Sequence, residues 1–414
     1  MMLVSQPTQI MTVAGTGEGG YAGDGGPALS ACFNEPKAVA LDSAGHLYIA
    51  DAENHVIRKV DGATGVISTV AGQGEGDGGG ESSRPPFSAH SLSVSDAEED
   101  PLASPDPGTT DRYTQLRDLS GTVRFVVGSS RKSSRFAGDG GPATQALLHF
   151  PSSVAVDERG NLYIADTMNH RVRVVDAAIG VITTLAGTGR AGFSGDGGLA
   201  VAASLNEPTC VVVDDRRRAL FVADQSNHRV RRIDLETGLM STMAGTGESG
   251  FDGDQVPAAQ AALGGPSGLA VGPDGELYIA DTFNSRIRRV DPVTGAIGTV
   301  AGDGGTYRYE AGQDGASANL SRPYGIAVDA DGNLLITDSD SHLIRRWDRR
   351  TGQISLVAGN GMAGYAGDGG SPAESGLNYP FGVAVDAKGD IFIADTFNHR
   401  IRKISSVGER QVER

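Results

Sequence analysis

The chain has 414 residues, of which 60 are glycine, and it carries a formal net charge of −16 at pH 7. This acidity argues against nucleic acid as a partner, since phosphate binding depends on clustered lysine and arginine. The two cysteines, Cys32 and Cys210, exclude a disulfide framework and a cysteine zinc site, and we expect both to be free thiols.

The first predicted element is a strand over residues 9–15, QIMTVAG, which matches the strand that ends each repeat in the rest of the chain. The last repeat stops after IRKIS, at residue 405, where its third strand ends and no fourth follows. We therefore predict that residues 9–15 complete the last sheet and close a ring, which hides the sheet edges. Residues 405–414 are expected to be a polar tail.

A repeat of about 57 residues organises the sequence. LYIADAENHVIRKVD begins at Leu47, and close variants begin at Leu162, Leu220, Leu277, Leu334 and Ile391. Each repeat predicts four strands: a small apolar strand such as VAVD (residues 154–157), the LYIA strand, an alternating strand and a last strand such as AIGTVAG (residues 296–302). In the alternating strand we expect Ile287 to face inward and Arg286 and Arg288 to face outward. Six such units predict an all-β, closed β-propeller of four-stranded blades, forming a single domain over residues 1–414.

Residues 73–120 interrupt the pattern with a segment rich in serine, proline and aspartate whose length makes the excess one repeat. Two interpretations remain open. The segment is a degenerate seventh repeat, with SGTVRFVVG (residues 120–128) as its fourth strand, or a disordered insertion in a six-bladed ring.

The turn after strand two and the long link to the next strand one share one face of the predicted ring. The links are loops of roughly 20 residues, a length that is often functional. They repeat the motif AGDGG, which is SGDGG in one loop, and Asp24, Asp139, Asp196 and Asp368 offer one carboxylate per loop. A hard cation needs more ligands than that, so we favour a glycine turn in which each aspartate bonds its own backbone.

Two residue types recur once per repeat in the turn after strand two. A ring of imidazoles suggests a metal, but repeated residues spread around a circle instead of converging, so we assign them to the scaffold. They are Asp51, Asp166, Asp224, Asp281, Asp338 and Asp395, with His55, His170, His228, His342 and His399.

Residues that break the repeat on this face are better candidates for binding a ligand. They are Arg190 and Phe193 in one loop and Tyr307, Arg308, Tyr309 and Glu310 in another. The sequence contains no nucleophile elbow, HExxH helix or paired-carboxylate signature, so no catalytic residue is assigned. No signal peptide or membrane span is visible either, and we expect a monomer with a cytoplasmic or an unassigned location.

The motif DTxNHRIRxVD, preceded by VAVDxxGNLYIA, resembles the NHL repeat, and the AGDGGPA loops resemble those of teneurin-type and bacterial propellers. The resemblance implies a six-bladed platform for proteins, RNA or other ligands. The resemblance also extends to two metal-dependent enzyme relatives, peptidyl-amidoglycolate lyase and the gluconolactonase-like hydrolases. We expect a non-catalytic scaffold that binds a protein or peptide through the Gly-rich loop face without a cofactor. The alternative is a metal-dependent lyase or lactonase-like hydrolase with calcium or zinc in the central channel.

Overall fold

The structure is a computed structural model, and it describes residues 8–74, 114–117, 123–126, 135–305 and 314–405. It divides into two compact units, residues 1–76 with 135–414 and residues 77–134. The regular elements of the described residues are strands and short 3₁₀ turns. None of their helices has the length and apolar character needed to cross a membrane.

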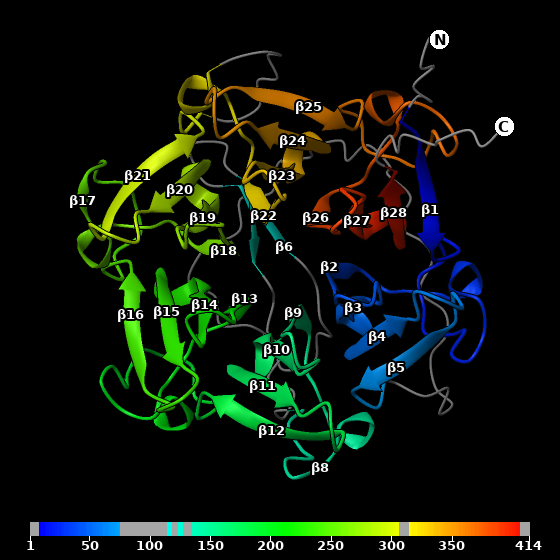
Figure 1. The fold of residues 1–414 in the computed structure, drawn as a ribbon, viewed down its shortest axis with the longest axis horizontal. Helices are drawn as coiled ribbons and strands as arrows, with labels where there is room; N and C mark the ends of the chain where they lie inside the picture. Colours follow the sequence, from blue (N-terminus) through cyan, green and yellow to red (C-terminus); the bar gives the residue numbers. More distant parts are fainter. Residues whose placement is uncertain (1–7, 75–113, 118–122, 127–134, 306–313, 406–414) are drawn as a thin grey trace, which may run out of the picture. The chain divides into compact units, whose positions relative to one another are not determined.

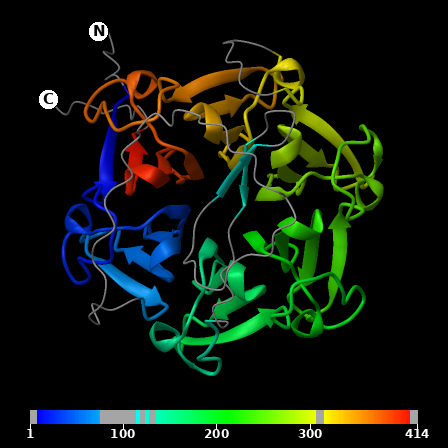
Figure 2. The same cartoon turned by 180° about the vertical axis from the view of Figure 1, so that it is seen from behind.

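The larger unit is a ring of six antiparallel sheets (Figure 1). In five of them the four main strands follow in sequence order from the axis to the rim, and in the sixth the rim strand comes from the start of the chain. Figure 2 shows the same ring from behind. The first three blades are β2 (Pro36–Leu41), β3 (Leu47–Asp51), β4 (Val56–Val60) and β5 (Ile67–Ala71); β9 (Pro151–Val156), β10 (Leu162–Asp166), β11 (Arg171–Val175) and β12 (Val181–Ala186); and β13 (Pro208–Asp214), β14 (Ala219–Asp224), β15 (Arg229–Asp234) and β16 (Met240–Ala244). The last three are β18 (Pro266–Val271), β19 (Leu277–Asp281), β20 (Arg286–Val290) and β21 (Ala296–Ala301); β22 (Pro323–Val328), β23 (Leu334–Asp338), β24 (Leu343–Trp347) and β25 (Ile354–Ala358); and β26 (Pro380–Val385), β27 (Ile391–Asp395) and β28 (Arg400–Ile404) with β1 (Ile10–Ala14).

The sixth blade joins the two ends of the unit. β1 pairs antiparallel with β28, and Ile10 lies opposite Ile404. Ile10 is fully buried, so the strand contributes core as well as hydrogen bonds. β1 therefore covers the edge of β28, as the fourth strand does in the other five blades.

Every innermost strand begins at a proline, three residues before the apolar run that predicts it. The missing N–H of proline costs no ladder bond there, because these strands form the inner edge of each sheet. The core lies between the blades, and both faces of strand two are covered. In β3 of the first blade, Tyr48 packs against residues of the second blade, and Ile49 packs against residues of its own blade and of the sixth.

The expectation that the arginines of strand three face outward is wrong for one arginine in each blade. Arg288 is fully buried, as are its equivalents Arg58, Arg173, Arg231, Arg345 and Arg402. Alternation predicts one wet face only for a sheet with one covered side, whereas a blade is covered on both sides. The other arginine, Arg286, is partly exposed.

The Gly-rich loops run along the rim instead of standing free on one face. Residues from β8 (Gly141–Pro142) and β17 (Val256–Pro257) pair with the outer strands β12 and β21, and Pro27 forms a matching bridge to Val66. Each loop then makes a 3₁₀ turn that contacts the outer strand of the preceding blade: η1 (Ala28–Ser30), η3 (Ala143–Gln145), η5 (Ala200–Ala202), η7 (Ala258–Gln260), η9 (Gly315–Ser317) and η11 (Pro372–Glu374). The loops cover edges that would otherwise be free to pair.

The smaller unit contains a two-stranded antiparallel sheet, β6 (Thr114–Arg117) with β7 (Val123–Val126). Residues 120–128 were expected to be the fourth strand of a blade, but β7 pairs with β6 in a hairpin. Within the described ranges there are six four-stranded blades and no seventh. Most of the interrupting segment, residues 75–113, lies outside the described residues.

Candidate binding site at the axial mouth

The repeated aspartates and the buried arginines form one network per blade. In the third blade, Arg231 lies 3.3 Å from Asp224 Oδ2 and 2.7 Å from Asp196 Oδ1 of the rim loop. The fourth blade repeats this arrangement with Asp281, Arg288 and Asp254. The aspartates of the AGDGG loops thus pair with a buried arginine, which corrects the expectation that they bond their own backbone.

The buried aspartates also hold the start of the innermost strand. Asp51 Oδ1 accepts a hydrogen bond from the Asn34 N–H at 2.8 Å, and Asp51 Oδ2 accepts one from the Asn54 side chain at 2.8 Å. Burial raises the pKa of Asp51 to about 7, against the lowering effect of these hydrogen bonds and of Arg58. The group is enclosed by scaffold, so it offers no open carboxylate to a ligand.

The repeated histidines link neighbouring blades. Each stands at positive φ after the 3₁₀ turn that follows strand two, a conformation that histidine tolerates better than most residues. These turns are η2 (Ala52–Asn54), η4 (Thr167–Asn169), η6 (Gln225–Asn227), η8 (Thr282–Asn284), η10 (Ser339–Ser341) and η12 (Thr396–Asn398). The imidazole Nδ1 accepts a backbone N–H just before the next blade, at 3.1–3.2 Å, in the pairs His55–Phe150, His170–Glu207, His228–Gly265, His342–Tyr379 and His399–Glu35. Ser285 takes the histidine position in the fourth blade.

These turns and the starts of the innermost strands lie at the same end of the ring, because Pro36 pairs with Asp51 and the other blades repeat this pairing. We call this end the turn face. The residue after each strand-one proline varies between blades, with serine in two of them, and we call these six residues the axial mouth: Lys37, Ser152, Thr209, Ser267, Tyr324 and Phe381. The scaffold around them repeats, so the axial mouth is where the blades present different chemistry to a shared centre.

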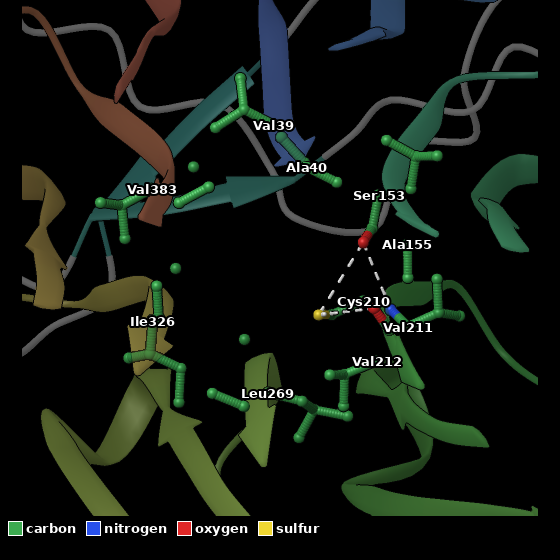
Figure 3. A pocket seen from close by; sticks show the side chains of 18 of the residues that line it. Val39, Ala40, Ser153, Ala155, Cys210, Val211, Val212, Leu269, Ile326 and Val383 are labelled. Atoms are coloured by element: carbon green, nitrogen blue, oxygen red, sulfur yellow. Dashed lines mark hydrogen bonds between the residues drawn. The ribbon is translucent and has the colours of Figure 1, made fainter. Parts of the chain in front are cut away.

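The axial mouth lines a cavity of about 310 Å³ that is bounded by the six innermost strands (Figure 3). Its deeper wall is aliphatic and is formed by Val39, Val154, Val211, Leu269, Ile326 and Val383. Glycines narrow one side of the wall: a Cβ on Gly268 or Gly325 would lie 2.2 Å from a carbonyl oxygen of the next strand. Its lining surface is shared about equally between polar and apolar atoms, and its volume is at the small end of the range for ligand pockets.

One half of the axial mouth is aromatic. The rings of Tyr324 and Phe381 are 4.5 Å apart, and Tyr379 and Phe397 lie 5.3 Å apart beside them. Lys37 Nζ lies 4.3 Å from the centre of the Phe381 ring and 3.0 Å from Glu35 Oε2. Aromatic rings attract a cation placed over their faces, so these contacts hold the ammonium at the mouth.

The other half carries the hydroxyls of Ser152, Thr209 and Ser267, which donate to backbone carbonyls of the next blade. Small polar groups also follow in the wall below them. Ser153 Oγ accepts a hydrogen bond from the Val211 N–H at 3.3 Å and lies 3.9 Å from Cys210 Sγ (Figure 3). Both cysteines are free thiols, as predicted, and burial raises the pKa of Cys210 to about 11. At neutral pH this thiol is protonated, so it is a weak hydrogen-bonding group and a poor nucleophile.

The residues predicted to bind a ligand do not meet at this mouth. Phe193 lies over the guanidinium of Arg229 at 3.7 Å, and Phe136, Phe251 and Tyr365 make the same contact in other blades. Phe193 is therefore a repeated position, and Arg190 is an exposed residue of the same rim loop. Tyr307, Arg308, Tyr309 and Glu310 lie outside the described residues.

The residues that line the cavity do not fit a catalytic metal. Calcium requires several oxygen ligands and zinc requires nitrogen, sulfur or carboxylate ligands, but the lining contains no carboxylate or imidazole and only one thiol. Within the described ranges, no group of three or more histidine, cysteine, aspartate or glutamate side chains is placed to hold a metal ion. We derive no reaction step through calcium or zinc.

Sequence reasoning missed the axial mouth. Its members are one per blade, in strands that were predicted to begin three residues later, and each looks ordinary in its own repeat. The available signal was a comparison of the repeats position by position just after the strand-one proline.

Comparisons with known proteins identify the repeat. The teneurin NHL domain matches residues 9–103 and 109–194, and the NHL repeat matches residues 263–289, 320–347 and 377–404. The chain is 33% identical over 275 residues to Protein SUPPRESSOR OF QUENCHING 1, chloroplastic, from Arabidopsis thaliana, covering 64% of this chain and 26% of that protein. It is 30% identical over 285 residues to human NHL repeat-containing protein 2, covering 63% of this chain and 39% of that protein.

Solved structures share the fold at low sequence identity. An auxiliary nutrient binding protein from Bacteroides ovatus aligns with a TM-score of 0.60 at 14% identity, covering 97% of this chain and 77% of that chain. A gluconolactonase from Xanthomonas campestris aligns with a TM-score of 0.52 at 14% identity, covering 97% of this chain and 95% of that chain. The matched repeats confirm the predicted resemblance, and the chain belongs to the family of NHL-repeat β-propellers.

Proposed function

We propose that this propeller is a non-catalytic scaffold that binds a protein or peptide through the turn face, with the axial mouth as the centre of the contact. One observation carries the proposal. Six equivalent positions around the axis hold six side chains that include an ammonium, hydroxyls and two aromatic rings, while the surrounding scaffold is repeated. Tyrosine and phenylalanine supply large, rigid contact surfaces and are enriched where proteins meet.

The backbone before the strand-one prolines supports this assignment. Glu35, Phe150, Glu207, Arg322 and Tyr379 all have positive φ, and only the equivalent Gly265 adopts it without strain. Strained residues of this kind cost on the order of 1–3 kcal/mol each and cluster at binding sites. Five blades keep a side chain at a position that favours glycine, which is expected if the side chains are used.

Selection of peptides from a random display library on the immobilised protein tests the proposal. We expect the selected peptides to lose affinity by about tenfold or more when Tyr379 and Phe397 are both changed to alanine. The matched control is Val293→Ala, in an exposed turn at the opposite end of the ring. Peptides that bind equally well to both variants would contradict the proposed site.

A further inference from the structure

The axial cavity contains a single charged side chain among the residues that line it, and that side chain is Lys37. Two other lining groups could ionise, but burial raises the pKa of Cys210 to about 11 and that of Tyr324 to about 12. Both are neutral at pH 7. The cavity therefore has aliphatic side chains in its wall, one ammonium at its mouth that is paired with Glu35, and no carboxylate among the residues that line it.

Lys37 is held in place and still has hydrogen-bonding capacity. Its side chain is 9% exposed, and its Nζ lies between the Phe381 ring and the Glu35 carboxylate. An ammonium has three N–H groups. In the described part of the chain, Glu35 Oε2 is the one acceptor within hydrogen-bonding distance of Nζ. Nζ also lies 5.3 Å from the centre of the Phe397 ring and 5.7 Å from that of the Phe150 ring, so a ligand carboxylate would approach it beside three aromatic rings.

We propose that the axial cavity binds a small aliphatic monocarboxylate, with its carboxylate hydrogen-bonded to Lys37 and its hydrocarbon part against the aliphatic wall. At about 310 Å³ the cavity is at the small end of the range for ligand pockets, so it suits a small ligand. Ser153 and Cys210 provide a weak polar contact on the other side of the cavity.

The lining disfavours the other ligand classes. A cation would find no free carboxylate, because the lining residues include none and the nearby Glu35 is already paired with Lys37. A sugar would place some of its hydroxyl groups against the valine, leucine and isoleucine side chains of the wall, which offer no hydrogen bond. An aliphatic acid buries hydrocarbon there and pairs its one charge.

Octanoate, octanamide and octylamine form a matched set of probes, and isothermal titration of the protein without any peptide measures their binding. We expect saturable binding of octanoate, and binding at least about tenfold weaker for the amide and the amine, because a hydrogen bond between two charged groups is stronger than its neutral counterpart. Equal affinity for the acid and the amide, or no saturation by octanoate up to about 10 mM, which is weaker than a useful site, would overturn the proposal.

Lys37→Met removes the charge and keeps the apolar stem. We expect this variant to bind octanoate about tenfold or more weakly. Arg350→Met, which removes an exposed positive charge from a turn at the opposite end of the ring, should leave binding unchanged. The fluorescence of Trp347, the single tryptophan of the chain, checks that both variants are folded. If Lys37→Met does not fold, the acid and amide comparison on the unaltered protein still decides the question.

The carboxylate can be that of a free acid or that of a peptide C-terminus, since both present the same group. Gly-Gly-Leu with a free carboxylate and its C-terminal amide distinguish the two sources. Tighter binding of the tripeptide acid than of octanoate would assign the site to a C-terminus, and the reverse order to a free acid. Failure of all these probes would leave the peptide selection on the turn face unaffected, because that experiment uses Tyr379 and Phe397.

Discussion

His399 of the last blade accepts a hydrogen bond at Nδ1 from the Glu35 N–H at the start of the first blade, at 3.2 Å. The contact crosses the closure of the ring, and β1 makes a second link there by pairing with β28. The same histidine contact joins four other blade boundaries. It explains why an Asn-His pair recurs without forming a metal site: each imidazole is an acceptor for the next blade.

Changing His399 to alanine should lower the free energy of unfolding by about 1–3 kcal/mol, because the buried Glu35 N–H loses its acceptor. Urea unfolding measures the change. Ser285→Ala is the matched control, since serine takes the histidine position there, and we expect a smaller loss. Equal losses in the two variants would contradict the role assigned to the imidazole.

The contribution of His399 should weaken in acid. Burial is the largest cause that lowers the pKa of His399 below its ordinary value of about 6.5, and Arg400 and Lys37 add to it. The unfolded chain therefore takes up the proton first, and stability is lost as the pH falls from about 6.5 toward the folded pKa. We expect the stability difference between the unaltered protein and His399→Ala to shrink between pH 7 and pH 5. The carboxylates are common to both proteins, so their effect cancels, and a constant difference would contradict the assignment.

Arg231 and Arg232 are neighbours on β15 with different environments. Arg231 is fully buried between Asp224 and Asp196, whereas Arg232 is about one-third exposed and pairs with Asp234 at 3.4 Å. Arg231→Met should cost about 3–5 kcal/mol because it leaves the Asp224 carboxyl buried without its partner. Arg232→Met should change stability by less than about 1 kcal/mol. Thermal and urea unfolding of the two variants measure these losses of stability. A similar loss in both variants would contradict the buried network.

Gly268 lies in the innermost strand β18 and Gly298 in the outer strand β21 of the same blade, so alanine at each position compares how closely neighbouring atoms approach the two strands. A Cβ at Gly268 would lie 2.2 Å from the carbonyl oxygen of Tyr324, while the nearest atom to a Cβ at Gly298 is the side-chain nitrogen of Gln255 at 3.3 Å. Gly268→Ala should destabilise the protein by about 1–3 kcal/mol, and Gly298→Ala should be close to neutral. If Gly268→Ala were also neutral in urea unfolding, the innermost strands would not approach as closely as described.

The repeat made most of the fold predictable. The spacing of Asp51 and its five equivalents gives the repeat length, and the LYIA run predicts a strand that is covered on both faces. Residues 9–15 match a fourth strand without the three strands that precede it in a repeat, which predicts the closure of the ring. Arg288 was assigned to the wrong environment because alternation within one strand does not show that a neighbouring blade covers its second face. The fourth loop also retains Asp254 for Arg288, although its AGDGG motif is not recognisable.

The candidate site could not be predicted in the same way. Lys37 and Phe381 lie near opposite ends of the sequence, and ring closure brings them within 4.3 Å. Arg190 and Phe193 drew attention because their loop is long and rich in glycine, but that loop covers a rim. Residues that converge on an axis come from equivalent positions in successive repeats, so local motifs do not reveal them.

The most direct test of the central claim, that partners bind at the turn face around the axial mouth, is backbone amide hydrogen exchange with and without the tightest selected peptide. We predict slower exchange for the first residues of β2, β22 and β26 and for the turn η12, with little change at the exposed turn around Val293. Slower exchange confined to that opposite end of the ring, or to the rim loops around Phe193, would contradict the account.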